Sequence, residues 1–204
     1  DASNKLGTQM KATGEVMSIG RTMEESLLKA MRSLETGVCH IYHKKFDDWT
    51  NDRLLEYIAE PTDDRLYAIA QLIRGGVDLV LIYNRTKIDM FFLEKFKNIV
   101  EFERVVEAAP MNIEVLREAK RMGFSDKFIG QLWGVSQHDM YLLREKNGIF
   151  PVYKMIDTCA SEFSSYVPYF YSTYEDENES LVSDKEKIVV LGSGPIRIGQ
   201  GVEF

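Results

Sequence analysis

Cysteine is scarce in this sequence, and long apolar runs are missing altogether. Two cysteines, Cys39 and Cys159, stand far apart among 204 residues. This usage favours reduced thiols, as in a cytosolic protein, over a disulfide framework. No stretch of about 20 apolar residues is present, which excludes a transmembrane helix. No basic segment followed by an apolar one opens the chain, so no signal peptide is expected.

Basic residues are also too few for a general nucleic-acid or membrane-surface binder. Lysine and arginine number 25 against 32 aspartates and glutamates, which gives a formal net charge of −7. Contacts with phosphate require clustered lysine and arginine, which this balance does not favour. What the chain does have is apolar content, at 45% of its residues. That content supports a sizeable core in one domain, with or without attached segments.

Polar caps and closing glycines predict a compact helical domain between Thr22 and residue 150. Thr22 and Glu25 have the spacing of a capping box, in which each side chain satisfies a backbone N–H at the open helix end. Asn112, Ser125 and Ser136 each precede a short apolar segment, and a glycine follows each segment. These residue types start and stop helices. The sequence therefore predicts a mainly α fold.

The middle of this region is less regular. Residues 38–61 mix aromatic and charged side chains without a clear period. After them we expect a helix capped by Thr62, and then a loop or short strand over residues 79–83. The longest helix is expected over residues 87–108, where Pro110 bars its continuation. Its inner face is expected to hold Phe92, Phe96, Ile99, Glu103 and Val106.

The segments outside the helical region have a different character. Residues 1–21 are extended and punctuated by glycine, and residues 152–156 are typical of a strand. The acidic run at 175–179 is most simply a solvated linker. Residues 187–195 predict a buried strand that leads into a glycine-rich turn. We therefore expect the sequence to end inside an opening strand–helix unit.

Two motifs suggest ligand binding, and each departs from its template. The glycine-rich loop at 192–201 could cradle a phosphate at a helix N-terminus. Its glycines miss the GxGxxG spacing, however, and no Gly-Lys-Ser/Thr follows. Cys39, His40 and His43 could supply metal ligands, but no second pair is nearby. We favour strand-to-helix packing for the loop and a surface loop without metal for the Cys–His cluster.

A helix-turn-helix is the main alternative from another functional class. Helices expected at 125–133 and 136–146 are joined by Gly134-Val135, which would suit a DNA-binding regulator. The second helix carries Asp139 in its first turn, where contacts with bases or phosphates need donors. Together with the acidic balance of the chain, this favours an ordinary helical hairpin.

Carboxylates are abundant, and two of them stand out. Glu15 and Glu203 each lie in an apolar, glycine-rich stretch, where a solvated charge is less expected. On the residues alone, each of them is equally well a surface residue. No Ser–His–Asp or Cys–His catalytic set can be assembled from the sequence.

Three blocks of the sequence resemble the large subunit of carbamoyl-phosphate synthetase. Residues 6–22, LGTQMKATGEVMSIGRT, are similar to the end of its first ATP-grasp module. Residues 157–163, DTCASEF, with 171–175, YSTYE, resemble the segment that leaves its oligomerization domain. Residues 192–204, GSGPIRIGQGVEF, resemble the start of its second synthetase half. The order and spacing of the blocks also agree with that subunit.

This resemblance implies a division of the chain. Residues 1–21 would be the C-terminal stub of the first, carboxyphosphate half, and residues 22–150 the helical oligomerization domain. Residues 151–186 would connect that domain to the stub of the second, carbamoyl-phosphate half at 187–204. The fold would then be mainly α, flanked by short strand and loop stubs of neighbouring α/β domains.

The resemblance also implies a function for the parent protein. That cytoplasmic ligase makes carbamoyl phosphate from bicarbonate, ammonia (usually from glutamine) and ATP, for pyrimidine or arginine synthesis. It uses Mg²⁺ or Mn²⁺ and K⁺, and its partner is a glutaminase small subunit. The helical domain would serve architecture and self-association, without nucleic acid or membrane. Because the family's ATP-binding residues fall outside this chain, the fragment is expected to be inactive and to bind neither cofactor nor metal.

In the same family, carbamate is thought to pass between the two halves through an internal tunnel. Glu15, Gly201 and Glu203 match positions near that passage, and the resemblance assigns no catalytic residue here. A glycine would keep the bore open, and carboxylates would supply hydrogen-bond acceptors along it. They would also repel anionic carbamate, which suggests that neutral carbamic acid passes instead.

Overall fold

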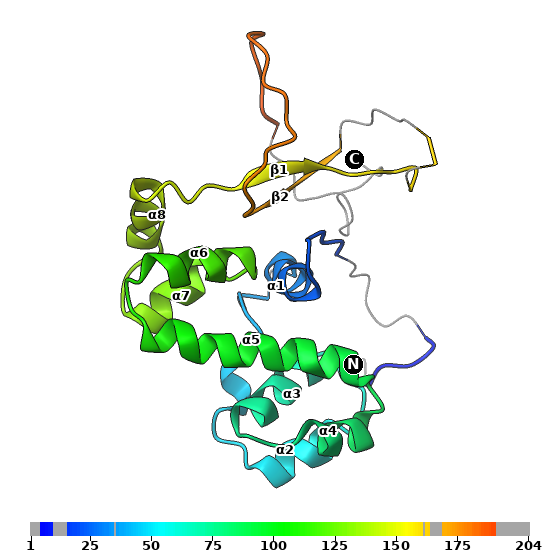
Figure 1. Cartoon of the computed structure of the whole chain (residues 1–204). Helices are drawn as coiled ribbons and strands as arrows, with labels where there is room; N and C mark the ends of the chain where they lie inside the picture. Colours follow the sequence, from blue (N-terminus) through cyan, green and yellow to red (C-terminus); the bar gives the residue numbers. More distant parts are fainter. Residues whose placement is uncertain (1–4, 10–15, 35, 161, 164–168, 191–204) are drawn as a thin grey trace.

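The computed structural model describes residues 5–9, 16–34, 36–160, 162–163 and 169–190 (Figure 1). Within them the chain is mainly helical, as expected, with one small two-stranded sheet. None of the helices among these residues is long and apolar enough to span a membrane. The elements in chain order are α1 (Met23–Ser33), the 3-10 turn η1 (Lys44–Phe46), α2 (Asn51–Tyr57), α3 (Arg65–Arg74), α4 (Leu79–Thr86), α5 (Met90–Ala108), α6 (Ile113–Arg121), α7 (Asp126–Trp133), α8 (Gln137–Lys146), β1 (Val152–Met155) and β2 (Phe170–Thr173).

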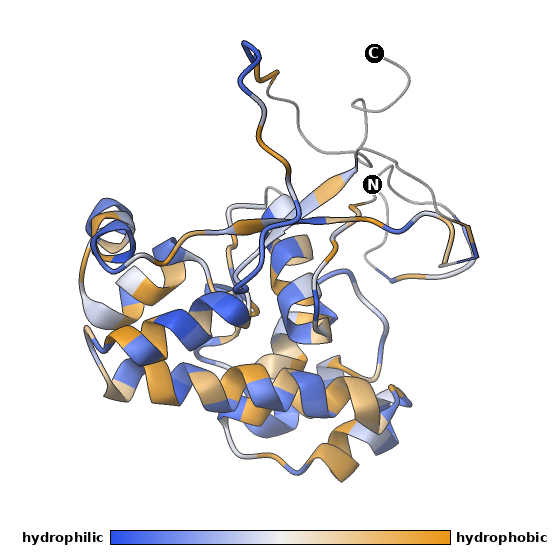
Figure 2. Ribbon diagram, turned by 45° about the horizontal axis from the view of Figure 1, so that its top comes forward, coloured by the Kyte–Doolittle hydropathy of each residue, from blue (hydrophilic) through white to orange (hydrophobic). Residues whose placement is uncertain are grey.

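The 19-residue helix α5 is the central element of the fold. It crosses the middle of the molecule in Figure 1, with α2, α3 and α4 on one side and α1, α6 and α7 on the other. It contacts five other helices, namely α1, α3, α4, α6 and α7. A helix in this position must bury a broad face, and Figure 2 shows apolar and polar residues alternating around it.

The inner face of α5 agrees with the prediction at all but one position. Phe92 is 42% exposed, and its ring meets that of Phe91 edge-on, with the centroids 5.3 Å apart. It stands in the first turn of the helix, away from the core. The side chains that are buried as expected are Phe96, Ile99, Glu103 and Val106.

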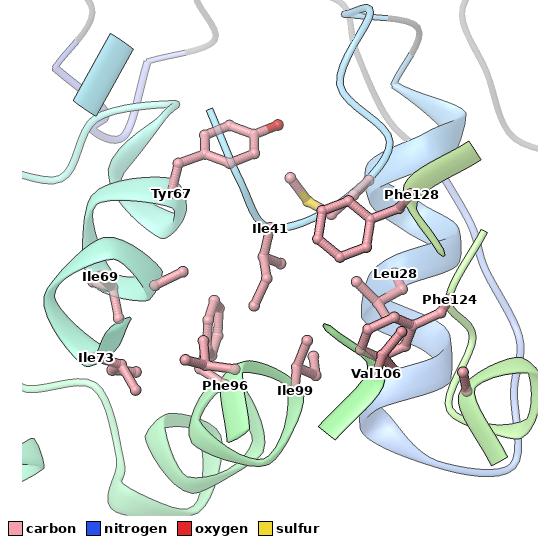
Figure 3. Close-up of a cluster of buried hydrophobic side chains, with 14 of the residues drawn as sticks. Leu28, Ile41, Tyr67, Ile69, Ile73, Phe96, Ile99, Val106, Phe124 and Phe128 are labelled. Atoms are coloured by element: carbon pink, nitrogen blue, oxygen red, sulfur yellow. The ribbon is translucent and has the colours of Figure 1, made fainter. Parts of the chain in front are cut away.

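The hydrophobic core lies against the inner face of α5, from which Phe96, Ile99 and Val106 point toward side chains of other elements in Figure 3. Leu28 of α1, Ile69 of α3 and Phe124 from the turn between α6 and α7 are all buried there. Each of these apolar side chains contributes about 1.5–3 kcal/mol when it is removed from water. The core thus joins the two groups of helices that lie on either side of α5.

Residues 38–61 contain structure that their irregular pattern did not predict. The turn η1 and the helix α2 both lie in this segment, and Thr50 caps α2 by accepting the N–H of Arg53. Ile41, Phe46 and Leu54 point into the core and are no more than 1% exposed. Elements this short bury only one or two side chains each, so they leave no period in the sequence.

The expectation of a loop or strand over residues 79–83 is wrong, because these residues belong to α4. Asp78 caps this helix by accepting the N–H of Val80 at 2.8 Å. Ile82 is the only residue of α4 that is fully buried, so the apolar run does not show a helical period. Since α4 extends to Thr86, the long helix α5 begins at Met90, after the cap Asp89, rather than at residue 87.

The predicted caps of the last three helices are confirmed. Asn112 accepts the N–H groups of Glu114 and Val115, and Ser125 accepts that of Phe128 at 3.1 Å. Ser136 and Asp139 form a complete capping box. Each such cap stabilises a helix by about 1 kcal/mol.

Two other predicted helix starts need correction. Thr22 accepts the N–H of Glu25 at 3.2 Å, but the carboxylate of Glu25 accepts the N–H of Arg21 instead of that of Thr22. The capping box of α1 is therefore incomplete. Helix α3 starts after Asp64 rather than after Thr62, and Asp64 makes no capping hydrogen bond because its side chain binds neighbouring residues.

The segment after the helices forms a β-hairpin. Strand β1 is confirmed where it was expected, and it pairs antiparallel with β2. The buried strand expected from residue 187 is wrong for residues 187–190, where Ile188 is 93% exposed and no regular structure is present. A buried strand requires a partner strand and a covering layer, and the described part of the chain supplies neither at this place.

Candidate functional site

The three site residues that the resemblance assigns are not placed by the structure. Glu15, Gly201 and Glu203 lie outside the described residues, and so does the glycine-rich loop at 192–201. The polar chemistry that can be described therefore lies in the helical domain and in the segments that meet it. Its main parts are two buried ion-pair networks and one charged surface cluster, and α1 adds the buried carboxylates of Glu24 and Glu25.

The Cys39, His40 and His43 cluster is not arranged as a metal site. His40 is 1% exposed, and its Nε2 lies 2.9 Å from Oε1 of Glu103 on α5. His43 caps η1, where its Nδ1 accepts the N–H of Lys45. Among the residues that the structure describes, no group of three or more His, Cys, Asp or Glu could hold a metal ion. The expectation of a surface loop is wrong for His40, because its ring is part of the core.

His40, Glu103 and Arg74 form a polar network inside the core. The Arg74 guanidinium donates from Nε and Nη2 to the two oxygens of Glu103, at 2.8 and 2.7 Å. The ring of His40 stacks on that of Phe128, with the centroids 3.6 Å apart. The network connects α3, α5 and the loop before η1. The only sign of this network in the sequence is Glu103, a charged residue on the otherwise apolar face of the longest predicted helix.

Burial decides the charges in this network. Burial lowers the pKa of His40, and this effect is larger than that of the Glu103 carboxylate, which raises the same pKa. His40 is therefore neutral at pH 7, and we assign its Nε2–H as the donor to Glu103. Burial alone would raise the pKa of Glu103, but the hydrogen bonds from Arg74 and His40 hold it below its usual value. One buried anion is thus balanced by one partly buried cation.

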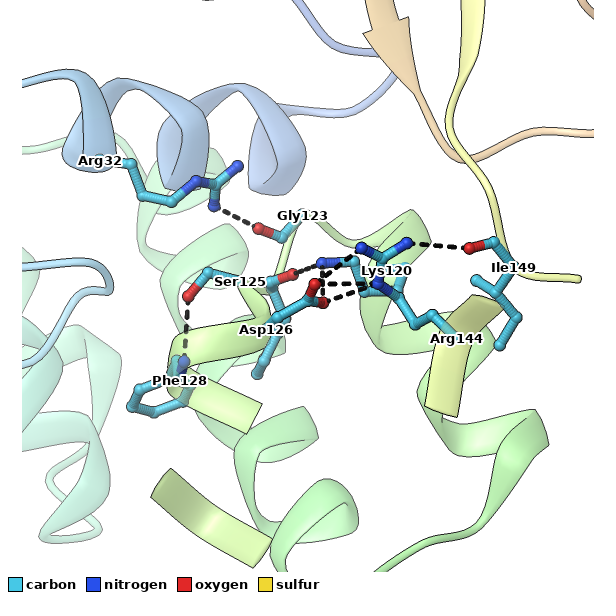
Figure 4. Close-up of polar contacts among 9 residues, drawn as sticks. Arg32, Lys120, Gly123, Ser125, Asp126, Phe128, Arg144 and Ile149 are labelled. Carbon is cyan, nitrogen blue, oxygen red and sulfur yellow. Dashed lines mark hydrogen bonds and ion pairs between the residues drawn. The ribbon is translucent and has the colours of Figure 1, made fainter. Parts of the chain in front are cut away.

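Asp126 is the centre of a second buried network, shown in Figure 4. Its carboxylate lies 2.8 Å from Nζ of Lys120 on α6 and 2.8 Å from Nη2 of Arg144 on α8. Lys120 also donates to the carbonyl of Phe124, and Arg144 donates to that of Ile149. Both cations are less than 10% exposed. One carboxylate in the first turn of α7 therefore connects α6, α7 and α8.

The titration of this second network also follows from its burial. Burial lowers the pKa of Lys120 to about 8. This effect is larger than that of the Asp126 carboxylate, which raises the same pKa. Burial alone would raise the pKa of Asp126, but Lys120 and Arg144 hold it below its usual value. Lys120 and Asp126 are therefore both charged at pH 7. Two cations share one anion, so the network depends strongly on that anion.

The α7–α8 hairpin is packed into the domain and does not support the DNA-binding alternative. Arg144, a cation of the second helix, is buried against Asp126 and is not presented to solvent. Asp139 accepts the N–H of Ser136, so its carboxylate is engaged within the helix start. Met140 is completely buried. Helix α7 belongs to the core, and α8 packs on α7, with Met140 and Arg144 as its buried residues.

The acidic run at 175–179 is docked against cations and is not simply a solvated linker. Glu175 lies 3.6 Å from Nζ of Lys154 on β1, and two further carboxylates of the run are within 3.8 Å of the same nitrogen. Asp176 pairs with Arg121 of α6 at 3.0 Å. The cations that receive the run come from distant parts of the sequence, so the run alone did not reveal this contact.

Five large apolar side chains are exposed on α4 and on the first turn of α5. They are between 38% and 53% exposed, and the two helices that carry them contact each other. Exposed apolar side chains on two helices in contact form a candidate interaction surface. We call this set the α4–α5 patch, and it consists of Val80, Leu81, Tyr83, Phe91 and Phe92.

Comparison with protein families identifies the helical region. A family model described as "carbamoyl-phosphate synthetase large chain, oligomerisation domain" matches residues 15–148. The match extends over more than half of the chain, and it includes every helix from α1 to α8 and both buried networks. It agrees with the mainly helical fold expected from the caps. The chain therefore belongs to the carbamoyl-phosphate synthetase large-chain family, of which it carries the oligomerisation domain.

Proposed function

We propose that this chain is the self-associating, architectural segment of a carbamoyl-phosphate synthetase large chain. The observation that carries the proposal is the family match over residues 15–148, whose description names oligomerisation. The mainly helical fold supports it, since α5 and the core make one body of the two groups of helices. The α4–α5 patch supports it further, because its apolar side chains are 38–53% exposed.

A second copy of this domain is the occupant that we propose for the α4–α5 patch. The apolar side chains are bordered by cations, since Nζ of Lys87 lies 5.3 Å from the ring of Tyr83 and Nζ of Lys95 lies 5.2 Å from that of Phe91. The caps Asp78 and Asp89 place carboxylates at the starts of the same two helices. A patch that carries both signs of charge can pair with its own copy around a two-fold axis.

We expect Leu81→Asp to weaken self-association of the chain by at least about tenfold, because a carboxylate buried at an apolar interface costs more than about 1.4 kcal/mol. Sedimentation equilibrium measures the dissociation constant. Leu142→Asp on α8 is the matched control, since Leu142 is 45% exposed against 52% for Leu81 and lies outside the patch. If both variants associate as the wild type does, the patch is not the interface. If only Leu142→Asp weakens association, the interface lies on α8.

The role of the parent protein follows from the family as a proposal. Residues 1–21 and 187–204 would be stubs of the two synthetase halves, with residues 22–150 as the helical domain and 151–186 as the connection to the second half. The parent would make carbamoyl phosphate in the cytoplasm, using ATP, Mg²⁺ or Mn²⁺, and K⁺. It would receive ammonia from a glutaminase small subunit. Support for this division comes from the match, which begins and ends close to the proposed boundaries of the helical domain.

Glu15, Gly201 and Glu203 remain our candidates for the passage between the halves. In the full-length enzyme, Gly201→Phe should uncouple bicarbonate-dependent ATP hydrolysis from carbamoyl-phosphate formation, because a large side chain would obstruct a narrow bore. Both products are measured in one assay. Gly201→Ala is the matched control, since it adds only a methyl group. Intact coupling in Gly201→Phe would exclude Gly201 from the passage.

A further inference from the structure

Lys29 of α1 holds two chain segments that are far apart in the sequence. Its Nζ donates to the carbonyl of Ile19, before α1, at 2.7 Å, and to that of Ser172, in β2, at 2.6 Å. It also donates to Oε1 of Glu25 at 2.7 Å. A lysine ammonium has three N–H donors, so all of them are used here. The two carbonyl oxygens must lie close together, because both bind the same nitrogen.

Glu25 completes this arrangement from inside the domain. Its side chain is 2% exposed, and Oε2 accepts the N–H of Arg21 at 2.7 Å. Gly20 packs directly against the same carboxylate, where a Cβ would lie 2.8 Å from Oε2. The segment before α1 is thus held by Glu25 at Arg21 and by Lys29 at Ile19. A buried carboxylate with these partners is sensitive to any change that leaves one of them unpaired.

Contacts between the two segments themselves support the same geometry. Nε of Arg21 lies 3.0 Å from Oε1 of Glu175, just after β2. Nζ of Lys29 lies 5.5 Å from the ring centroid of Tyr171, which adds a cation–π contact. Thr173, the residue after Ser172, is 2% exposed, so β2 is packed against the domain at its end, although Ser172 itself is exposed. The segment that enters α1 and the segment that follows β2 therefore lie next to each other on the helical domain.

We propose that Lys29 and Glu25 form a joint that fixes the segment at 16–21 and the strand β2 in one arrangement on the helical domain. The bonds from a charged donor to two carbonyls are stronger than those between neutral groups, and a cation with several donors can make them together. The consequence for the enzyme rests on the proposed function. If the two segments lead to the two synthetase halves, Lys29 is a positioning residue for one half relative to the other.

Distances measured by pulsed electron paramagnetic resonance on the full chain test the joint. The background carries Cys39→Ala and Cys159→Ala, with spin labels at Met17→Cys and Lys97→Cys in one sample and at Phe170→Cys and Lys97→Cys in another. With Lys29 intact, each pair should give one narrow distance peak. In Lys29→Met, both pairs should lose that peak and broaden. Lys29→Arg should keep both peaks, because it restores a cation with several donors.

Glu25→Gln gives a second and more selective variant. The amide can still accept from Lys29, but its NH₂ group meets the N–H of Arg21 donor to donor. The Met17 pair should therefore broaden while the Phe170 pair keeps its peak. Lys127→Met, at an exposed lysine of α7, is the control and should change neither pair.

Circular dichroism establishes that each variant is folded before the distances are compared. If Lys29→Met unfolds the domain, the distances in Glu25→Gln test the joint instead. Broadening of the Met17 pair alone supports the joint, and narrow peaks for both pairs overturn it. Narrow peaks for both pairs in a folded Lys29→Met would overturn the joint. That outcome is independent of sedimentation, so it leaves the proposal of self-association untouched.

Discussion

Asp126→Ala is expected to lower the free energy of unfolding by about 3–5 kcal/mol, because it removes one partner from buried ion pairs. The substitution leaves Lys120 and Arg144 as two uncompensated cations less than 10% exposed. Besides Asp126, they donate to the backbone carbonyls of Phe124 and Ile149, and these carbonyls and the nearby ring of Tyr174 carry no charge to balance them. Urea unfolding followed by circular dichroism measures the change.

The matched control for this prediction is Asp176→Ala. Asp176 also pairs with an arginine, but its side chain is 90% exposed. Exposed pairs contribute about 0–1 kcal/mol, so this variant should differ little from the wild type. Asp126→Asn should fall between the two, since it keeps the shape and loses the charge. Equal stability of Asp126→Ala and Asp176→Ala would contradict the importance of burial in this network.

Glu103→Ala is expected to cost a similar amount, about 3–5 kcal/mol, because it removes the largely buried carboxylate that pairs with Arg74. His40 loses its hydrogen-bond acceptor in the same variant. Glu101→Ala on the same helix is the control, since the side chain of Glu101 is 56% exposed and its pair with Lys97 is 3.5 Å long. Thermal and urea unfolding of both variants measure the difference. A loss below about 1 kcal/mol in Glu103→Ala, as for an exposed pair, would contradict the assignment.

The effect of Glu103→Ala should also depend on pH. The pKa of Glu103 in the folded chain lies below its usual value of 4.5, so its contribution is fully present above pH 4.5 and is lost as the pH falls further. The difference in stability between wild type and Glu103→Ala should therefore shrink below pH 4.5. A difference that grew on acidification would show that Glu103 is not the stabilising anion.

The parts of the fold that could be predicted are those that depend on neighbouring residues. The caps at Asn112, Ser125 and Ser136 act on N–H groups two or three positions away, so the sequence displays both members of each interaction. The inner face of α5 was visible because a long helix repeats its period several times. The resemblance in three blocks located the domain within a family before any contact was known.

The buried networks could not be predicted in the same way. His40 is 63 positions from Glu103, and Lys29 is 143 positions from Ser172, so nothing local connects them. Helix α4 was missed because it buries Ile82 alone. The burial of His40 depends on Phe128, a residue that comes from the other end of the domain. These are tertiary effects, and they decide where charge can be placed inside the core.

Sedimentation of the wild-type chain over a wide range of concentrations tests the central proposal most directly, namely that this domain self-associates. We predict a reversible shift from monomer to dimer as the concentration rises, with the Leu81→Asp variant remaining monomeric over the same range. A wild-type chain that stayed strictly monomeric at the highest concentrations would contradict self-association and leave the domain an architectural role alone.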